Sequence, residues 1–62
     1  MWDGCKVFSA TMARDRESLG EKVTEWMRSN RSTIKVVDKV VSQSSDNEFH
    51  CLSITVFYAE LS

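Results

Sequence analysis

Residues 48–58 carry the strongest β-strand signal in the chain and constrain its fold more than any other segment. In a strand, successive side chains point to opposite faces. One side of this segment would carry His50, Leu52, Ile54, Val56 and Tyr58, and the other Phe49, Cys51, Ser53, Thr55 and Phe57. A strand with one face in water alternates between apolar and polar residues. Because both sides hold apolar residues here, we expect a central strand with both faces at least partly covered.

The rest of the chain predicts two more strands and one helix. Residues 5–9 predict a short first strand, and residues 33–43 predict a long, valine-rich second strand. Between them, apolar residues at helical spacing predict a helix over residues 12–29. These residues are Met12, Leu19, Val23, Trp26 and Met27. We expect Ser9 or Thr11 to cap the first turn of this helix.

Gly20 stands in the middle of the predicted helix, where glycine costs about 1 kcal/mol relative to alanine. It adjoins the apolar residues Leu19 and Val23. We interpret Gly20 as a point where the helix approaches the sheet closely. The alternative is a tolerated weak position on the flank of the helix.

The alternation of the second strand is broken. Ile34 and Val36 share one phase, whereas Val37 and Val41 share the other, and the polar residue Asp38 falls among the apolar ones. This pattern indicates either a β-bulge near residues 36–38 or a strand with both faces partly buried.

These elements predict a β-α-β-β order in a single domain over residues 1–62. A crossover helix makes the second strand parallel to the first. The polar residues 44–47 predict a hairpin, which makes the third strand antiparallel to the second. With the most apolar strand in the middle, we expect a two-layer α+β fold: a three-stranded sheet of order 1-3-2 with one helix on one face. The tail after Tyr58 is expected to fray.

One face of this sheet has no helix to cover it. We expect an exposed apolar patch there, drawn from Phe8, Val37, Val41, Phe49, Cys51 and Phe57. A 62-residue chain buries only about 60% of its unfolded surface and usually needs further stabilisation. Two cysteines are too few for a disulfide framework and lack zinc-site spacing. Exposed apolar patches mark interfaces, so we predict self-association into a homo-oligomer, or binding to another protein.

Composition argues against several partners and locations. The formal net charge is −1, which gives little attraction to phosphates, so nucleic acid is not expected as a partner. No apolar run reaches the roughly 18 residues of a membrane span, so no membrane association is expected. The first residues lack the basic and apolar parts of a signal peptide, so we expect a cytoplasmic protein with reduced thiols.

The chain offers few candidates for chemistry. His50 and Cys51 are neighbours on one strand and point to opposite faces, so they cannot act as a base–nucleophile pair. Cys5 could approach Cys51 in a 1-3-2 sheet, but we interpret both as packing residues. No catalytic or metal-binding residue and no cofactor is predicted. The candidate ligand contacts are His50, Asp38 and Gln43; the alternatives are a rim position for the histidine and edge protection by the aspartate.

Two resemblances follow from these segments. Lys6-Val7-Phe8, the helix ending near Trp26-Met27, residues 34–38 and residues 52–58 together resemble a family of small sporulation-associated proteins of spore-forming bacteria. That resemblance implies no activity for any residue. The β-α-β-β order also resembles the dodecins, which implies flavin sites between subunits of a hollow dodecamer. Gln43 would match the dodecin glutamine contact, whereas the second and third predicted strands contain no tryptophan for the flavin to stack on.

The function predicted from the sequence is a small homo-oligomeric interaction or structural module without catalysis. The alternative is a dodecin-like protein that binds a flavin or nucleotide between subunits. A third hypothesis is a small enzyme built around His50 at a subunit boundary.

Overall fold

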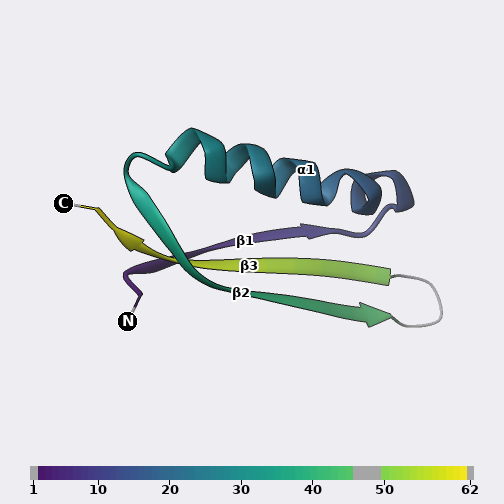
Figure 1. Cartoon of the computed structure of the whole chain (residues 1–62). Helices are drawn as coiled ribbons and strands as arrows, with labels where there is room; N and C mark the ends of the chain where they lie inside the picture. The colour runs from purple at the N-terminus through teal and green to yellow at the C-terminus, as the bar shows by residue number, and fades with distance from the viewer. Residues whose placement is uncertain (1, 46–49, 62) are drawn as a thin grey trace.

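The computed structural model describes residues 2–45 and 50–61. The chain forms β1 (Gly4–Ala10), α1 (Ala13–Asn30), β2 (Ile34–Ser45) and β3 (His50–Glu60), as Figure 1 shows. The three strands form one sheet of order β1-β3-β2, and both outer strands run antiparallel to β3. The predicted α+β fold, with the most apolar strand in the centre, is therefore confirmed.

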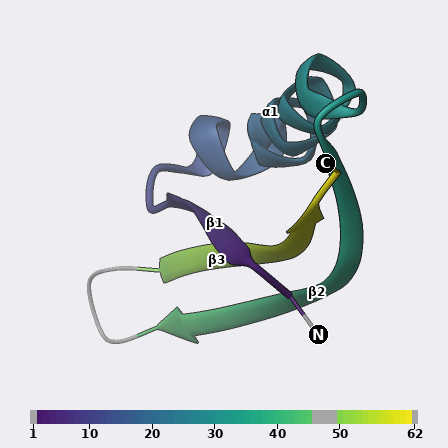
Figure 2. The same ribbon diagram turned by 90° about the vertical axis from the view of Figure 1, so that its left-hand side faces the viewer.

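Helix α1 lies across one face of the sheet (Figures 1 and 2), and in the described part of the chain no second helix or strand lies over the opposite face. The core between the two layers is small. Among the described residues the buried hydrophobic side chains are Leu19 and Val23 of α1 and Val56 of β3. Leucine and valine at positions 19 and 23 are one helical turn apart, so they meet the sheet from the same side of α1.

An aromatic cluster extends this core. The ring of Trp26 lies 5.8 Å from the ring of Phe8 and 5.8 Å from the ring of Tyr58, measured between centroids. The even-numbered side of β3 therefore faces the helix, as predicted. Phe8 faces the helix as well, not the uncovered face where the sequence placed it. The reason is register: Phe8 pairs with Ile54, and paired residues share a face of the sheet.

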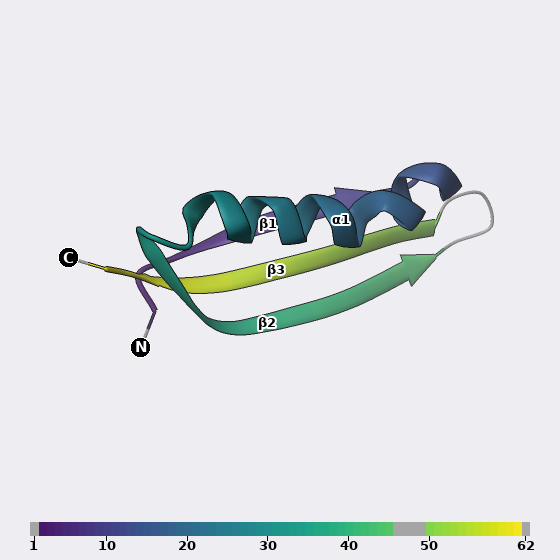
Figure 3. The same cartoon turned by 45° about the horizontal axis from the view of Figure 1, so that its top comes forward.

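The predicted bulge in β2 is present. Val36 pairs with Tyr58 and Asp38 pairs with Phe57, so Val37 is an extra residue in β2. The extra residue inverts the alternation of the strand after it. Val41 consequently pairs with Ile54 and lies on the helix side of the sheet, not on the uncovered face as expected. It is still 61% exposed, and Figure 3 shows the reason: α1 lies over β1, whereas β2 runs to one side of it.

The start of α1 and the end of β3 differ from expectation. Helix α1 begins one residue later than predicted, and Met12 occupies its N-cap position. No side chain caps the first turn, so the predicted capping by Ser9 or Thr11 is absent. Strand β3 continues to Glu60, and the Leu61 N–H donates to the Thr33 carbonyl at 2.8 Å, so residues 59–61 do not fray.

The two glycines differ in what surrounds them, and Gly20 fits the alternative of a weak position on the flank of the helix. A Cβ built at Gly20 would meet nothing within 4 Å, so this residue marks the exposed flank of α1 and no close approach to the sheet. A Cβ at Gly4 would lie 2.6 Å from the hydroxyl oxygen of Tyr58. Gly4 is therefore the position where the absence of a side chain lets the Tyr58 ring lie over the first strand.

Candidate interaction surface

The face of the sheet away from α1, called here the outer face, is defined by strand register. It carries the residues that alternate with the helix-facing ones: Cys5, Val7, Ser9, Lys35, Asp38, Val40, Ser42, Ser44, Cys51, Ser53, Thr55, Phe57 and Ala59. Val37 adjoins this face at the bulge, where it and Asp38 together oppose Phe57. The outer face thus runs across all three strands and, within the described residues, has no other layer over it.

One end of the outer face is apolar and bulky. The ring of Trp2 packs on Phe57 with centroids 5.0 Å apart, and Cys5 pairs with Phe57 in the sheet. We call this the aromatic end, defined by Trp2, Cys5, Val37 and Phe57. Next to it, Val7, Thr55 and Val40 form one row across the three strands. The apolar side chains Trp2, Val7, Val37 and Val40 are between 42% and 57% exposed.

The other end of the outer face carries small polar side chains. Ser9 of β1 pairs with Ser53 of β3, and Ser53 pairs on its other side with Ser42 of β2, so three serines form one row. Beyond this row Ser44 pairs with Cys51, whose Sγ lies 3.9 Å from the Ser53 Oγ. We call this the serine end, defined by these five residues. Along the strands, the side chains of the outer face therefore change from large and apolar at the aromatic end to small and hydroxyl-bearing at the serine end.

The residues expected to form the interface divide between the two faces. Cys51 and Phe57 lie on the outer face and Val37 adjoins it, whereas Phe8 and Val41 lie on the helix side and Phe49 lies outside the described residues. Sequence reasoning missed Val7 and Val40. A signal for Val7 was present, because a strand that turns Phe8 to the helix must turn Val7 away from it.

The ligand candidates do not form one site. Asp38 lies on the outer face, and its Oδ1 accepts a hydrogen bond of 2.8 Å from the Lys39 N–H, so this carboxylate stabilises the bulge. Gln43 and His50 lie on the helix side near the hairpin end, where Gln43 pairs with Leu52, two residues from His50. Both are exposed. Gln43 and His50 therefore differ from Asp38 both in the face of the sheet and in the end of the strands at which they lie.

The two cysteines are also apart. Cys5 pairs with Phe57, and Cys51 lies six residues away along β3 at the serine end. Six residues of strand span about 20 Å, far more than the reach of a disulfide. The approach of Cys5 to Cys51 that the strand order allowed is absent, and both are free thiols.

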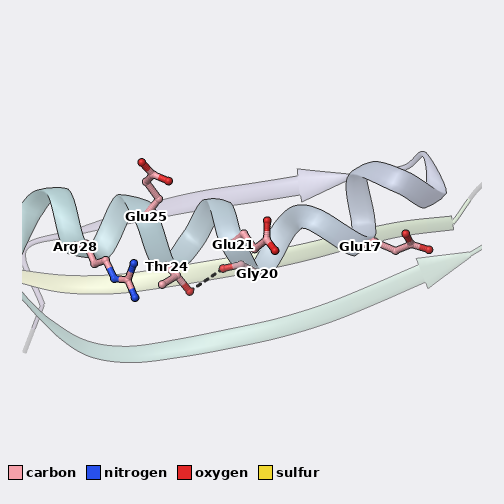
Figure 4. A pocket seen from close by; sticks show the side chains of 6 residues that line it. All are labelled: Glu17, Gly20, Glu21, Thr24, Glu25 and Arg28. Atoms are coloured by element: carbon pink, nitrogen blue, oxygen red, sulfur yellow. Dashed lines mark hydrogen bonds between the residues drawn. The ribbon is translucent and has the colours of Figure 1, made fainter.

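A hollow lies on the outside of α1. It is lined by Glu17, Gly20, Glu21, Thr24, Glu25 and Arg28 (Figure 4). All six belong to one helix, and the Thr24 hydroxyl donates to the Gly20 carbonyl at 2.9 Å. The hollow reflects the missing side chain at Gly20 on a solvated helix surface, and no second element closes it.

Polar groups elsewhere give no second site. Arg16 lies on the sheet side of α1, and its Nε is the one buried side-chain polar atom of the described residues without a hydrogen-bond partner. No cluster of three or more histidine, cysteine, aspartate or glutamate residues that could hold a metal ion occurs in residues 2–45 and 50–61. Within those same ranges, no helix has the length and hydropathy needed to cross a lipid bilayer. The candidate site of the described chain is therefore the outer face.

Comparison of the chain with protein-family models, with curated proteins and with solved structures found no match.

Proposed function

We propose that this chain is a small non-catalytic interaction module that works as a homo-oligomer assembled through the outer face. The observation that supports this most directly is the imbalance between core and surface. Three hydrophobic side chains are buried among the described residues, whereas seven large hydrophobic ones are more than 40% exposed. Four of those seven, Trp2, Val7, Val37 and Val40, lie on or beside the outer face.

The accessible area supports the same conclusion. The chain exposes 4888 Å², whereas a compact monomer of 7.1 kDa would expose about 4,100 Å². The excess of about 800 Å² equals what each partner contributes to a protein–protein interface of standard size. The radius of gyration agrees: it is 13.0 Å, against about 10.6 Å for a compact chain of this length.

The energetics favour covering this face. A half-exposed valine or larger side chain contributes roughly 1 kcal/mol when it is fully covered. Four such side chains on each of two copies contribute roughly 8 kcal/mol before the entropic cost of association. The whole folding free energy of a 62-residue domain is about 3–9 kcal/mol. Assembly would thus stabilise the fold by an amount comparable with folding itself.

The location that fits this proposal is the cytoplasm. Cys5 is exposed and neither cysteine is in a disulfide. A free, exposed thiol persists in a reducing compartment, where disulfides are rare.

The test is native mass spectrometry of the untagged protein, together with gel filtration and light scattering at micromolar concentration. The expected species is a defined multiple of the 7.1 kDa chain. A 7.1 kDa monomer under these conditions would contradict the proposal. The same spectrum distinguishes the flavin- or nucleotide-binding alternative, because a bound ligand would add its mass to the oligomer.

A further inference from the structure

We infer that two copies of this chain pack outer face to outer face with their strands running in opposite directions, so that the aromatic end of each copy covers the serine end of the other. This inference rests on the proposed function, because it takes the outer face as the surface of assembly. It adds which residues meet and where the symmetry axis lies.

The first argument is steric. Packed sheets lie about 10 Å apart, and their interiors reach crystal-like density by placing large side chains against small ones. If two aromatic ends faced each other, Trp2 and Phe57 would meet their own copies and hold the sheets apart. The serine rows would then face each other across an unfilled space. When the aromatic end of each copy lies against the serine end of the other, both halves of the interface are filled equally.

The second argument comes from symmetry. Most homodimers have a two-fold axis, and the same patch then meets itself. A two-fold axis that lies in the interface along the row of Val7, Thr55 and Val40 reverses the strand direction. It places each residue of this row near its own copy, and it places the row of Phe57 over the row of Ser53 of the second copy. The row on the axis is apolar at both edges, as the centre of an interface should be.

The third argument concerns the carboxylate of Asp38 on the outer face. Asp38 pairs with Phe57, so in this arrangement it faces the row of serines and lies near Ser42 of the second copy. A serine hydroxyl can donate to the carboxylate, which a buried charge requires. With strands running in the same direction, Asp38 would instead face the first strand of the second copy, near Cys5 and Trp2. Those surroundings would leave the Asp38 carboxylate against apolar side chains.

The exposed area of the whole chain exceeds that of a compact monomer by about 800 Å², which is about what one partner contributes to a standard interface. Packed sheets keep their strand directions within about 30°, so residues near the axis stay aligned while the corners diverge. Thr55 lies on the central strand of the axis row and is therefore the position closest to its own copy.

Crosslinking at two positions along β3 tests the arrangement. The first protein carries Thr55→Cys in a Cys5→Ser, Cys51→Ser background. The second carries Cys5→Ser alone, so that Cys51 is its single thiol. Both are treated with a short bismaleimide, and covalent dimer is measured on a denaturing gel. With opposed strands, two copies of position 55 meet at the axis, whereas two copies of Cys51 lie about 27 Å apart.

We expect covalent dimer from the Thr55→Cys protein and none from the protein whose single thiol is Cys51. Equal crosslinking of both proteins would overturn the inference, because it would show strands running in the same direction. Crosslinking of neither, in samples that native mass spectrometry shows to be oligomeric, would also overturn it while leaving self-association intact. A monomer by native mass spectrometry would instead contradict the proposed function itself. Gel filtration of each variant confirms that it folds and assembles like the parent protein.

Discussion

The carboxylate Oδ2 of Asp3 accepts a hydrogen bond of 2.7 Å from the backbone N–H of Glu60, a residue 57 positions away in the sequence. The Asp3 N–H in turn donates to the Tyr58 carbonyl at 2.7 Å. Together these bonds hold the residues before β1 against the end of β3. They also fix the chain next to Trp2, whose ring forms part of the aromatic end.

Replacing Asp3 should therefore weaken the fold. We expect Asp3→Ala to lower the free energy of unfolding by about 1 kcal/mol, because it removes one hydrogen bond to an exposed backbone group. Asp3→Asn keeps an acceptor oxygen and should cost less. Urea unfolding at a fixed protein concentration measures both, since the proposed self-association would make the apparent stability depend on concentration. An unchanged midpoint for Asp3→Ala would show that water replaces this bond without loss.

Neighbouring valines of β2 provide a matched test of the outer face. Val40 lies on the outer face and Val41 on the helix side, and they are 49% and 61% exposed. We expect Val40→Lys to dissociate the proposed oligomer, because it places a charge at the centre of the proposed interface. Val41→Lys should leave it assembled. Light scattering after gel filtration distinguishes them, and dissociation by Val41→Lys alone would place the interface on the helix side.

Two leucines test how much the small core contributes. Leu19 is 2% exposed and Leu61 is 51% exposed. Leu19→Ala should cost about 2–5 kcal/mol, a large part of the stability of a domain this small. Leu61→Ala should change stability by less than about 1 kcal/mol. Circular dichroism during thermal unfolding measures both, and equal effects would mean that the core lies elsewhere.

The two glycines should respond to alanine in opposite directions. Gly20→Ala should stabilise the fold by about 1 kcal/mol, because alanine favours helix and its Cβ meets no other atom. Gly4→Ala should destabilise it by about 1–3 kcal/mol, because the new Cβ would overlap the Tyr58 ring. Denaturant titration reports both signs. In a Tyr58→Leu background the cost of Gly4→Ala should shrink, and an undiminished cost would assign it to the backbone.

The sequence predicted the parts of this fold that depend on one segment at a time. Apolar residues on both sides of residues 48–58 placed the third strand in the centre, and the broken phase around Val37 indicated the bulge. The side on which Phe8 falls was not predictable in this way, because Val7 and Phe8 are both apolar and only pairing with β3 decides between them. The alternation beyond the bulge misplaced Val41 for a related reason, since one extra residue inverts every later position.

The candidate surface was predictable only in outline. An uncovered face follows from one helix and three strands, and Phe57 and Cys51 follow from the alternation of the third strand. The row formed by Ser9, Ser53 and Ser42 depends on the register of three strands at once, which no local pattern specifies. Trp2 lies before the first strand, so no periodicity assigns it to a face, although its contact with Phe57 makes it central to the aromatic end.

The bulge at Val37 absorbs one residue of β2 that has no partner of its own on β3. Removing Val37 would return the strand to regular pairing and leave Val40, Ser42 and Ser44 on the outer face, because Val36 would still pair with Tyr58 and Asp38 with Phe57. Exchanging Val37 for another residue would leave all of those side chains where they are. Adding or removing one residue elsewhere in β2 would instead invert the faces of one part of the strand, so chains that keep the proposed assembly are expected to keep the strand length on either side of the bulge and an apolar residue in it.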